Sequence, residues 1–523
     1  MFDRRHFLAG ATLAGLAAPT VLRAEGGLFR DFPFSLGVAS GDPASDGFVI
    51  WTRLAPEPLD PHGGMPLASL PVDWEVASDG GFRDVVAKGT ALARSELAHS
   101  VHVEVAGLEP DRPYYYRFTA AGERSLRGRA RTLPLVGTHV DALKFGVCGC
   151  QHFESGFFGA YRHLAREDLA FVYHYGDFIY EYSQDYLFDT GLPTRPVRTN
   201  ARRNLIDLSD FRAAYSQQLG DIDLQAARSI HPFLSSFDDH EIRNDWVSVW
   251  DNWKMGLDGN DPDAPPPEVF MLRKQAAMQA WYEHMPVRRS MLPVNGMVAL
   301  NRELRYGDLM SMQLLDTRQY RDDQPCGDGF KPACPGVFDK RAEVLGKAQE
   351  EWLARNLGEG RATWNAIAQQ VTMMSLDRRR YADEKQKILN LDSWAGYEAP
   401  RERMLARLGG VQNPVVLTGD EHQNFCGDLI LKDKVVGAEF VGTSISSGGD
   451  GSDQRPGTDR FLANNPELKF ANDLRGYLVC DVTREAWQTH FMVVDKVTTP
   501  VNTLSKRATG VVENGVAGIK MSA

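Results

Sequence analysis

Seven short apolar segments, rich in β-branched and aromatic residues, recur along the chain after residue 142, separated by longer stretches with helical character. This alternation is typical of a layered α/β domain. Almost every segment ends in a polar residue or cluster, and such sheets bind ligands at the carboxyl edge of their strands. We therefore expect the polar ends to converge on one site. The segments are LKFGVCGC, LAFVYHYGDF, HPFLSSFDDHE, LMSMQLLDTR, WNAIAQQVTMM, PVVLTGDEH and AEFVGTSIS.

The residue types at these strand ends favour metal binding. Tyr180 lies three residues after Asp177, about one helical turn, so carboxylate and phenol can face one point. Thiolate and phenolate suit a ferric ion, whereas carboxylate and amide oxygens suit calcium, magnesium or manganese. The strand-end candidates are Cys150, Asp177, Asp239 with His240, Asp316 with Arg318, and Asp420 with His422.

Each motif also has a simpler interpretation. A lone Gly-Asp at a strand end is most often a turn, and an Asp next to a His also occurs as a capped turn with a satisfied imidazole. A free cysteine such as Cys150 is more commonly a buried thiol than a ligand. Three acidic strand ends in one chain nevertheless favour a common site.

The N-terminal part of the chain predicts a separate small domain. At 523 residues the chain is too long for one typical core. Residues 30–134 contain short alternating strands such as GFVIWTRL and HSVHVEVAGL, which predict a β-sandwich. The stretch LEPDRPYYYRF resembles a loop and strand of fibronectin type III domains, in which a tyrosine buttresses a corner. Tyr114, Tyr115 and Tyr116 are therefore predicted to be structural.

Helices are predicted between the apolar segments of the larger domain. LSDFRAAYSQQL, with Ser209 as a candidate N-cap, and RKQAAMQAWYEHM would cover the sheet. The proline-rich acidic stretch GLDGNDPDAPPPE, residues 256–268, is interpreted as a surface insertion, either a lid or an inert loop.

The six cysteines are too few for a dense disulfide framework. Cys326 and Cys334 flank the turn-rich loop GDGFKPA, so a disulfide between them is a reasonable hypothesis; two unpaired loop thiols are the alternative. Cys148, Cys426 and Cys480 lie in apolar surroundings and are predicted to be core residues.

The first residues, MFDRRHFLAGATLAGLAAPTVLRAEG, resemble a twin-arginine export signal spanning residues 1–24. A chance Arg-Arg pair before an ordinary helix is the alternative. From this signal we expect a periplasmic or secreted protein that meets the twin-arginine translocase during export. We expect no stable membrane insertion, because no later apolar stretch is long enough to cross a bilayer. The net charge of -11 argues against a nucleic-acid scaffold role.

Segments along nearly the whole chain resemble the PhoD-like alkaline phosphatase family, within the broader metallophosphoesterases that include purple acid phosphatases. They occur here in the family order. The segments are LGVASGDPASDGFVIWTRLAP, GCQHFESGFFGAYRHLA, HYGDFIYEY, LSDFRAAYSQQLGDIDLQAARSIHPFLSSFDDHEIRNDW, LDTRQYRDDQPC, WNAIAQQV and TGDEHQNF.

The resemblance implies an α/β (α+β) fold, with a four-layer αββα metallophosphoesterase domain over residues 140–500, preceded by the fibronectin-like sandwich and followed by a C-terminal tail, 501–523. It also implies one ferric and two calcium ions. By this resemblance Cys150, Asp177, Tyr180 and His422 would bind iron, Asp177 would bridge to calcium, and Asp239, Asn244 and Asp420 would supply further oxygen ligands.

Two further residues receive roles from the resemblance. His240 would contact the phosphoryl group or aid the leaving group. Arg318 would orient phosphate or support neighbouring ligands, with a salt bridge to an acidic residue as the alternative. The chain departs from the family at Gly149, Phe237 and Phe425, which would affect packing, and at Arg243, which leaves the exact calcium ligands open.

These features predict a secreted alkaline phosphatase or phosphodiesterase that hydrolyses small phosphate esters for phosphate scavenging. A metal-activated hydroxide would attack phosphorus, and metal-bound thiolate and phenolate would keep the centre active at alkaline pH. The alternatives are a phospholipase D-like phosphodiesterase and a noncatalytic exported calcium-binding protein.

Overall fold

The structure is a computed structural model that describes residues 29–183, 196–202, 204–249, 266–360, 362–381 and 383–522. The predicted export signal, residues 1–24, and residues 256–265 of the acidic insertion lie outside the described residues. None of the helices within those ranges is long and apolar enough to cross a membrane.

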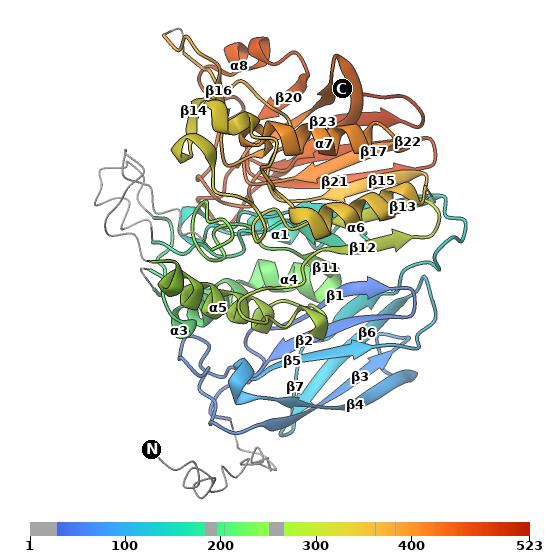
Figure 1. Cartoon of the computed structure of the whole chain (residues 1–523). Coiled ribbons are helices and arrows are strands. Elements are labelled where there is room, and N and C mark those ends of the chain that lie inside the picture. Colours follow the sequence, from blue (N-terminus) through green and yellow to red (C-terminus); the bar gives the residue numbers. More distant parts are fainter. Residues whose placement is uncertain are drawn as a thin grey trace, which may run out of the picture.

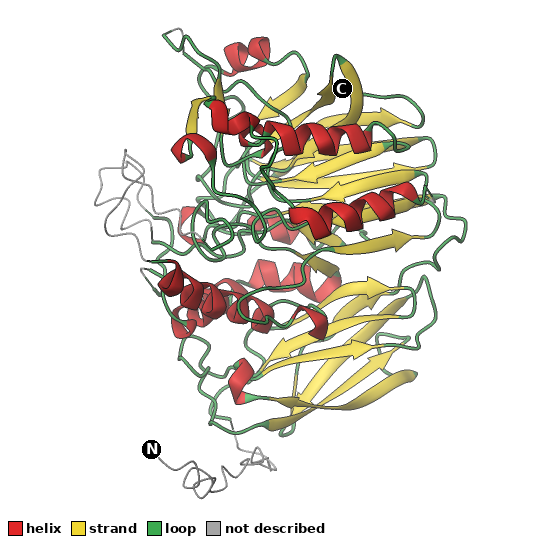
Figure 2. Cartoon of the chain, viewed as in Figure 1, coloured by secondary structure: helices red, strands yellow, loops and turns green. Residues whose placement is uncertain are grey.

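The largest sheet of the described structure has ten strands (Figures 1 and 2). Its central strands β9, β10, β11 and β1 run parallel, and β10 is buried throughout, as expected of a parallel strand covered on both faces. In sheet order the strands are β24 (Lys520–Ser522), β23 (Leu504–Glu513), β22 (Ala486–Val494), β21 (Gly476–Thr483), β9 (Ala142–Cys148), β10 (Val172–His174), β11 (Pro232–Ser235), β1 (Val38–Ala44), β2 (Gly47–Arg53) and β5 (Ser100–Val105).

A seven-stranded sheet packs against the first one. Phe145 and Tyr173 of the large sheet share one apolar core with Met312, Leu417 and Phe440 of the second. Strands β13, β15, β17 and β19 of this sheet are parallel. In sheet order the strands are β12 (Arg302–Tyr306), β13 (Met310–Leu314), β15 (Trp364–Ala368), β17 (Pro414–Thr418), β19 (Lys434–Val441), β18 (Asn424–Leu431) and β20 (Leu468–Asn472).

Helices cover the outer faces of both sheets, which confirms the predicted αββα layers (Figure 1). Helices α1 (Gly159–Leu164), α3 (Leu208–Leu219), α4 (Ile222–Ile230) and α5 (Pro267–His284) share a core with the large sheet, and α6 (Gly346–Gly358) and α7 (Glu398–Leu408) share one with the seven-stranded sheet. The predicted cap Ser209 is wrong: Asp207 caps α3, because its carboxylate accepts from the backbone N–H groups of Ser209 and Asp210. The short helix α8 (Thr458–Asn464) lies near β20.

The N-terminal sandwich shares a sheet with the large domain. One layer is β1-β2-β5, which continues the ten-stranded sheet through the parallel pairing of β1 with β11. Ile50 and Val103 of this layer pack on Val72 and Phe118 of the other. The other layer contains β4 (Val85–Ala93), β3 (Leu70–Ala77), β6 (Pro113–Ala120), β7 (Glu123–Arg124) and β8 (Gly128–Arg131).

The tyrosines of the sandwich have structural surroundings. The Tyr114 hydroxyl accepts a hydrogen bond from the Glu109 backbone N–H (3.0 Å) and so buttresses the corner. Tyr116 is fully buried in the sandwich core, and the ring of Tyr115 lies under the Arg127 guanidinium.

The C-terminal residues belong to the large sheet. Residues 501–523 were expected to form a tail, whereas β23 pairs with β22 and β24 pairs with β23. Most residues of the first half of β23 are exposed, since it lies near the sheet edge, so the sequence shows little apolar alternation there.

The cysteine predictions are confirmed. Cys326 and Cys334 form a disulfide that closes a loop containing β14 (Phe330–Pro332), which pairs with β16 (Ile388–Asn390). Cys148, Cys426 and Cys480 are buried free thiols.

Candidate metal centre

Four parallel strands deliver their polar ends to one edge of the two packed sheets. Cys150 follows β9, Asp177 follows β10, Asp239 follows β11 and Asp420 follows β17. Ligand atoms of Cys150, Asp177 and His422 all lie within 4.8 Å of one another. The same holds for the set Asp177, Asp239 and His240, and for the set Asp177, Asp238, Asp239 and Asp420.

The turns that carry these residues have an uncommon backbone conformation. Cys150, Asp177, Asp420 and His422 have φ values of 52°, 55°, 67° and 52°, in the left-handed region that non-glycine residues rarely adopt. Such conformations persist where the surrounding structure enforces them, and they cluster at functional sites. Gly176 has a φ of 132°, and a Cβ there would lie 2.4 Å from the Asp238 backbone nitrogen, so glycine lets the two loops approach.

On one side of the centre, a phenol, a thiol and an imidazole meet. The Tyr180 hydroxyl donates to Asp177 Oδ2 (3.0 Å) and lies 3.1 Å from His422 Nε2. Ser447 Oγ donates to the same hydroxyl (2.6 Å). Burial and the carboxylate of Asp177 raise the pKa of both Cys150 and Tyr180 well above their usual values. A bound cation would oppose these effects, because it favours thiolate and phenolate.

On the other side, four carboxylates crowd together. Burial and neighbouring aspartates raise the pKa of Asp420 well above its usual value, and burial raises that of Asp238 to about 6. Asp238 Oδ2 and Asp239 Oδ1 are buried without a hydrogen-bond partner in the described structure. Buried carboxylate oxygens of this kind require a counter-charge.

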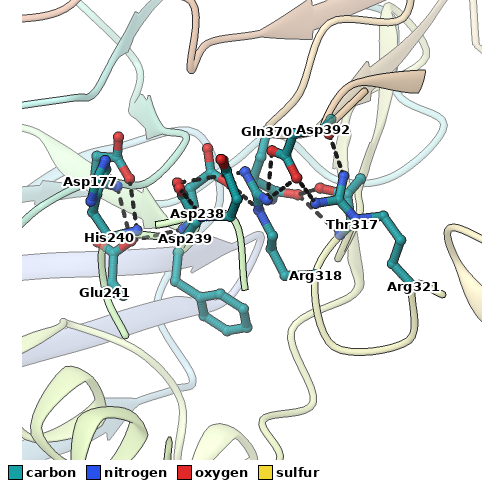
Figure 3. Close-up of polar contacts among 12 residues, drawn as sticks. Asp177, Asp238, Asp239, His240, Glu241, Thr317, Arg318, Arg321, Gln370 and Asp392 are labelled. Atoms are coloured by element: carbon teal, nitrogen blue, oxygen red, sulfur yellow. Dashed lines mark hydrogen bonds and ion pairs between the residues drawn. The ribbon is translucent and has the colours of Figure 1, made fainter. Parts of the chain in front are cut away.

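Arg318 is a cation embedded in this cluster (Figure 3). Its Nε donates to Asp238 Oδ1 (2.6 Å), its Nη1 contacts Asp392 (2.7 Å), and its Nη2 lies 3.5 Å from Asp239 Oδ1. The side chain is fully buried and does not line the cavity. This position matches the role of supporting neighbouring carboxylates, and it includes the salt bridge that the sequence left as an alternative.

His240 faces the cavity from a polar cradle. Its Nδ1 lies 2.7 Å from Glu181 Oε2, and its ring packs on Tyr180 with centroids 4.1 Å apart. Burial alone would lower the pKa of His240, but the carboxylates of Asp239 and Glu181 raise it well above its usual value. Glu181 thus orients the imidazole on the cavity, a position suited to contacting a phosphoryl group or donating a proton.

A cavity of about 570 Å³ opens over the centre, within the size range of small-molecule sites. Asp239, His240, Asn244, Asp420 and His422 all line it. Asn244 is held there by its backbone N–H, which donates to Glu181 Oε1 (2.8 Å).

Comparison with known proteins agrees with this geometry. The model of the PhoD-like phosphatase family matches residues 145–491, and that of the PhoD-like phosphatase N-terminal domain matches residues 22–134. The chain belongs to the PhoD-like phosphatase family. It is accordingly an enzyme that hydrolyses phosphate esters.

Individual relatives support the assignment. The chain is 43% identical to alkaline phosphatase D of Bacillus subtilis (strain 168), over 99% of this chain and 89% of that protein. The solved structure of PhoD matches with a TM-score of 0.88 and 44% identity, covering 95% of this chain and 93% of that one. A purple acid phosphatase from yellow lupin matches with a TM-score of 0.53 and 12% identity, over 91% of this chain and 74% of that one, which shows a shared fold.

Several residues of this PhoD-like phosphatase site received no role from the sequence. Asp238 joins the carboxylate set, and Glu241 accepts from the backbone N–H groups of Asp177, Phe178 and Asp238, tying two loops together. Both lie in the FDDHE motif, so the motif itself was the available signal. Ser447 follows the segment AEFVGTSIS, and its contact with Tyr180 had no sequence signal.

The departure at Gly149 has a packing reason. A Cβ at Gly149 would lie 2.1 Å from the ring of Tyr175, and one at Gly419 would lie 2.3 Å from the same ring. Tyr175 thus fills the space between two ligand loops, and its hydroxyl donates to the Thr443 carbonyl (2.6 Å). Two glycines make room for one tyrosine beneath the centre.

Proposed function

We propose that this PhoD-like phosphatase is exported by the twin-arginine route and hydrolyses small phosphate esters for phosphate scavenging, at a centre of one ferric and two calcium ions. Cys150, Asp177, Tyr180 and His422 would hold the iron. Asp177 would bridge to calcium, with Asp239, Asn244 and Asp420 as further oxygen ligands.

The observation that carries the proposal is the convergence of Cys150, Asp177 and His422, whose ligand atoms lie within 4.8 Å of one another. A thiol and an imidazole with the adjacent phenol of Tyr180 form a donor set suited to ferric iron, and the carboxylates beside it suit a hard divalent cation. The unpartnered oxygens of Asp238 and Asp239 fit a centre that binds cations.

The chain's own groups position and protonate the substrate. Bound cations supply charge neutralisation of the phosphoryl oxygens and activation of water. His240, oriented by Glu181, is placed on the cavity to stabilise the leaving oxygen or to protonate it. Arg318 holds Asp238 toward the centre and keeps the carboxylates from mutual repulsion.

Elemental analysis with a visible spectrum tests the metal assignment. Protein exported from its native host should contain iron and calcium and absorb in the visible, because phenolate bound to ferric iron gives a charge-transfer band. Tyr180→Phe removes the phenol oxygen alone and should abolish the band. Protein without iron and without hydrolysis of p-nitrophenyl phosphate would favour a noncatalytic calcium-binding protein instead.

The balance between monoesterase and diesterase activity needs its own assay. Turnover of p-nitrophenyl phosphate should be compared with that of its bis ester on the same metal-loaded enzyme. A preference for the bis ester would favour the phosphodiesterase alternative, including a phospholipase D-like activity.

Export is tested by replacing the arginine pair. Twin-arginine export carries folded proteins, which fits a centre loaded before export, and the Cys326–Cys334 disulfide fits an oxidising compartment. Arg4→Lys together with Arg5→Lys should retain the protein inside the cell. Unchanged export would refute this route.

A further inference from the structure

One wall of the active-site cavity is cationic. Arg378, Arg380 and Arg455 line the same cavity as Asp239 and Asp420, although the protein as a whole carries a net charge of -11. This local excess of guanidinium groups is what a second anionic group of a substrate would require.

The carboxylates near this wall are already engaged. Glu421 receives both terminal nitrogens of Arg378. Asp473 is shared between Arg455 (2.8 Å) and Arg475 (3.0 Å).

The carboxylate of Glu384 accepts hydrogen bonds from the backbone. Its Oε2 accepts from the backbone N–H groups of Arg380 (2.5 Å) and Tyr381 (2.6 Å). This carboxylate therefore fixes the loop of the wall through the backbone.

Arg380 differs from the other two arginines of the wall in its pairing. It forms no ion pair with a carboxylate of the described chain, its Nη2 reaches only Gln423 Oε1 (3.3 Å), and its Nη1 is buried without a hydrogen-bond partner. The guanidinium lies 4.8 Å from the Phe461 ring centroid, so it is held in place by packing. Burial lowers the pKa of Arg380, and the charges of Arg455 and Arg378 lower it further, against the smaller raising effects of the Asp473 and Glu421 carboxylates.

The wall and the metal centre are built on one segment. Asp420 and His422 contribute to the metal-binding sets, whereas the intervening Glu421 and the following Gln423 contact Arg378 and Arg380. The two surfaces are therefore fixed relative to each other, and the cavity of about 570 Å³ has room for a ligand that spans both.

We propose that Arg380 and Arg455 form an anion subsite that binds a second phosphate or carboxylate of the substrate while the scissile phosphate lies at the metal centre. The inference rests on the proposed function and narrows its substrates to esters with two anionic groups. Arg378 is a positioning residue, because its guanidinium is committed to Glu421.

A series of alkanediol bisphosphates of increasing length tests the subsite, each compared with the monophosphate that ends in a hydroxyl. On metal-loaded enzyme we expect one chain length to raise kcat/KM by roughly 10- to 100-fold over its monophosphate, the range for a charge-assisted hydrogen bond. This gain must exceed the doubling expected from two equivalent ester groups. It should fall with added salt, because the wall is partly exposed.

Arg380→Gln and Arg455→Gln should each reduce the preference for the bisphosphate, seen mainly as a higher KM for that substrate. Arg507→Gln is the matched control: it removes a guanidinium that pairs with Asp453 and does not line the cavity, so the preference should persist.

The outcomes separate the subsite from the proposed function. Absence of turnover on every ester would overturn the proposed function itself. Turnover of monophosphates with no length-dependent preference, or a preference that survives in both arginine variants, would overturn the subsite alone.

Discussion

Two parts of the active site differ in the sign of their uncompensated charge. The first is the carboxylate cluster of the metal centre, called the floor here, and the second is the arginine wall of the cavity. On the floor, Asp177, Asp238, Asp239 and Asp420 lie close together, and the buried guanidinium of Arg318 pairs with Asp238 and lies 3.5 Å from Asp239. On the wall, Arg378 and Arg455 pair with carboxylates, whereas Arg380 forms no ion pair within the described residues. Buried charge without a partner is costly, so each imbalance indicates the ligand expected there: cations on the floor and an anion on the wall.

The largest expected effect comes from weakening the floor. Asp177→Ala removes a carboxylate common to all three possible metal-binding sets, so kcat should fall by more than roughly 100-fold, the upper end for residues that only support a metal site. Turnover of p-nitrophenyl phosphate and metal content are the measurements. Asp141→Ala, at a side chain 89% exposed, is the control, and retained activity in Asp177→Ala would refute the assignment.

The next effect concerns the cation that holds the floor together. Arg318→Met leaves Asp238 without its ion-pair partner in a fully buried site, which should lower the free energy of unfolding by about 3–5 kcal/mol. Denaturant unfolding measures this change. Arg318→Lys should be intermediate, because lysine keeps the charge but lacks the fork that reaches both Asp238 and Asp392.

The exposed pair Arg341–Asp339 supplies the control for that experiment. The Arg341 side chain is 91% exposed, so Arg341→Met should change stability by less than about 0.5 kcal/mol. If Arg318→Met and Arg341→Met lower the free energy of unfolding equally, burial gives the Arg318 ion pair no additional stabilising effect.

A smaller effect is expected on the wall. Arg378→Gln frees the Glu421 carboxylate inside the cavity, where it would repel an anionic substrate, so KM should rise by about tenfold. Adding Glu421→Gln should restore part of the loss, because the unpaired charge is then gone. If the double variant is no better than the single one, repulsion is not the cause.

The smallest effect on catalysis is expected at the disulfide. Cys326→Ser with Cys334→Ser should lower stability by about 2–3 kcal/mol through the loss of a short closed loop. Gly329 and Phe330 of this loop line the cavity beside the wall, so KM should rise less than in Arg378→Gln. Thermal unfolding measures the stability and steady-state kinetics measure KM. An unchanged unfolding temperature would contradict a stabilising role of the disulfide.

The amino-acid sequence by itself determined the alternation of strands and helices, the strand-end candidates and the short-range disulfide. The reason is local: apolar runs mark buried strands, parallel strands place their ends at one edge, and the eight-residue separation of Cys326 and Cys334 permits closure. Residues such as Asp177 and Asp420 could be selected because each follows its strand by only two or three positions.

Only the tertiary structure decided how those residues divide their roles. In FDDHE, Asp238 and Asp239 face the centre while Glu241 binds backbone N–H groups, a distinction set by the turn and not by residue type. The sandwich and the large domain share one sheet because β1 pairs with β11, a long-range contact without a local pattern. The cationic wall likewise joins Arg380 and Arg455 from distant segments, so its charge excess exists only after folding.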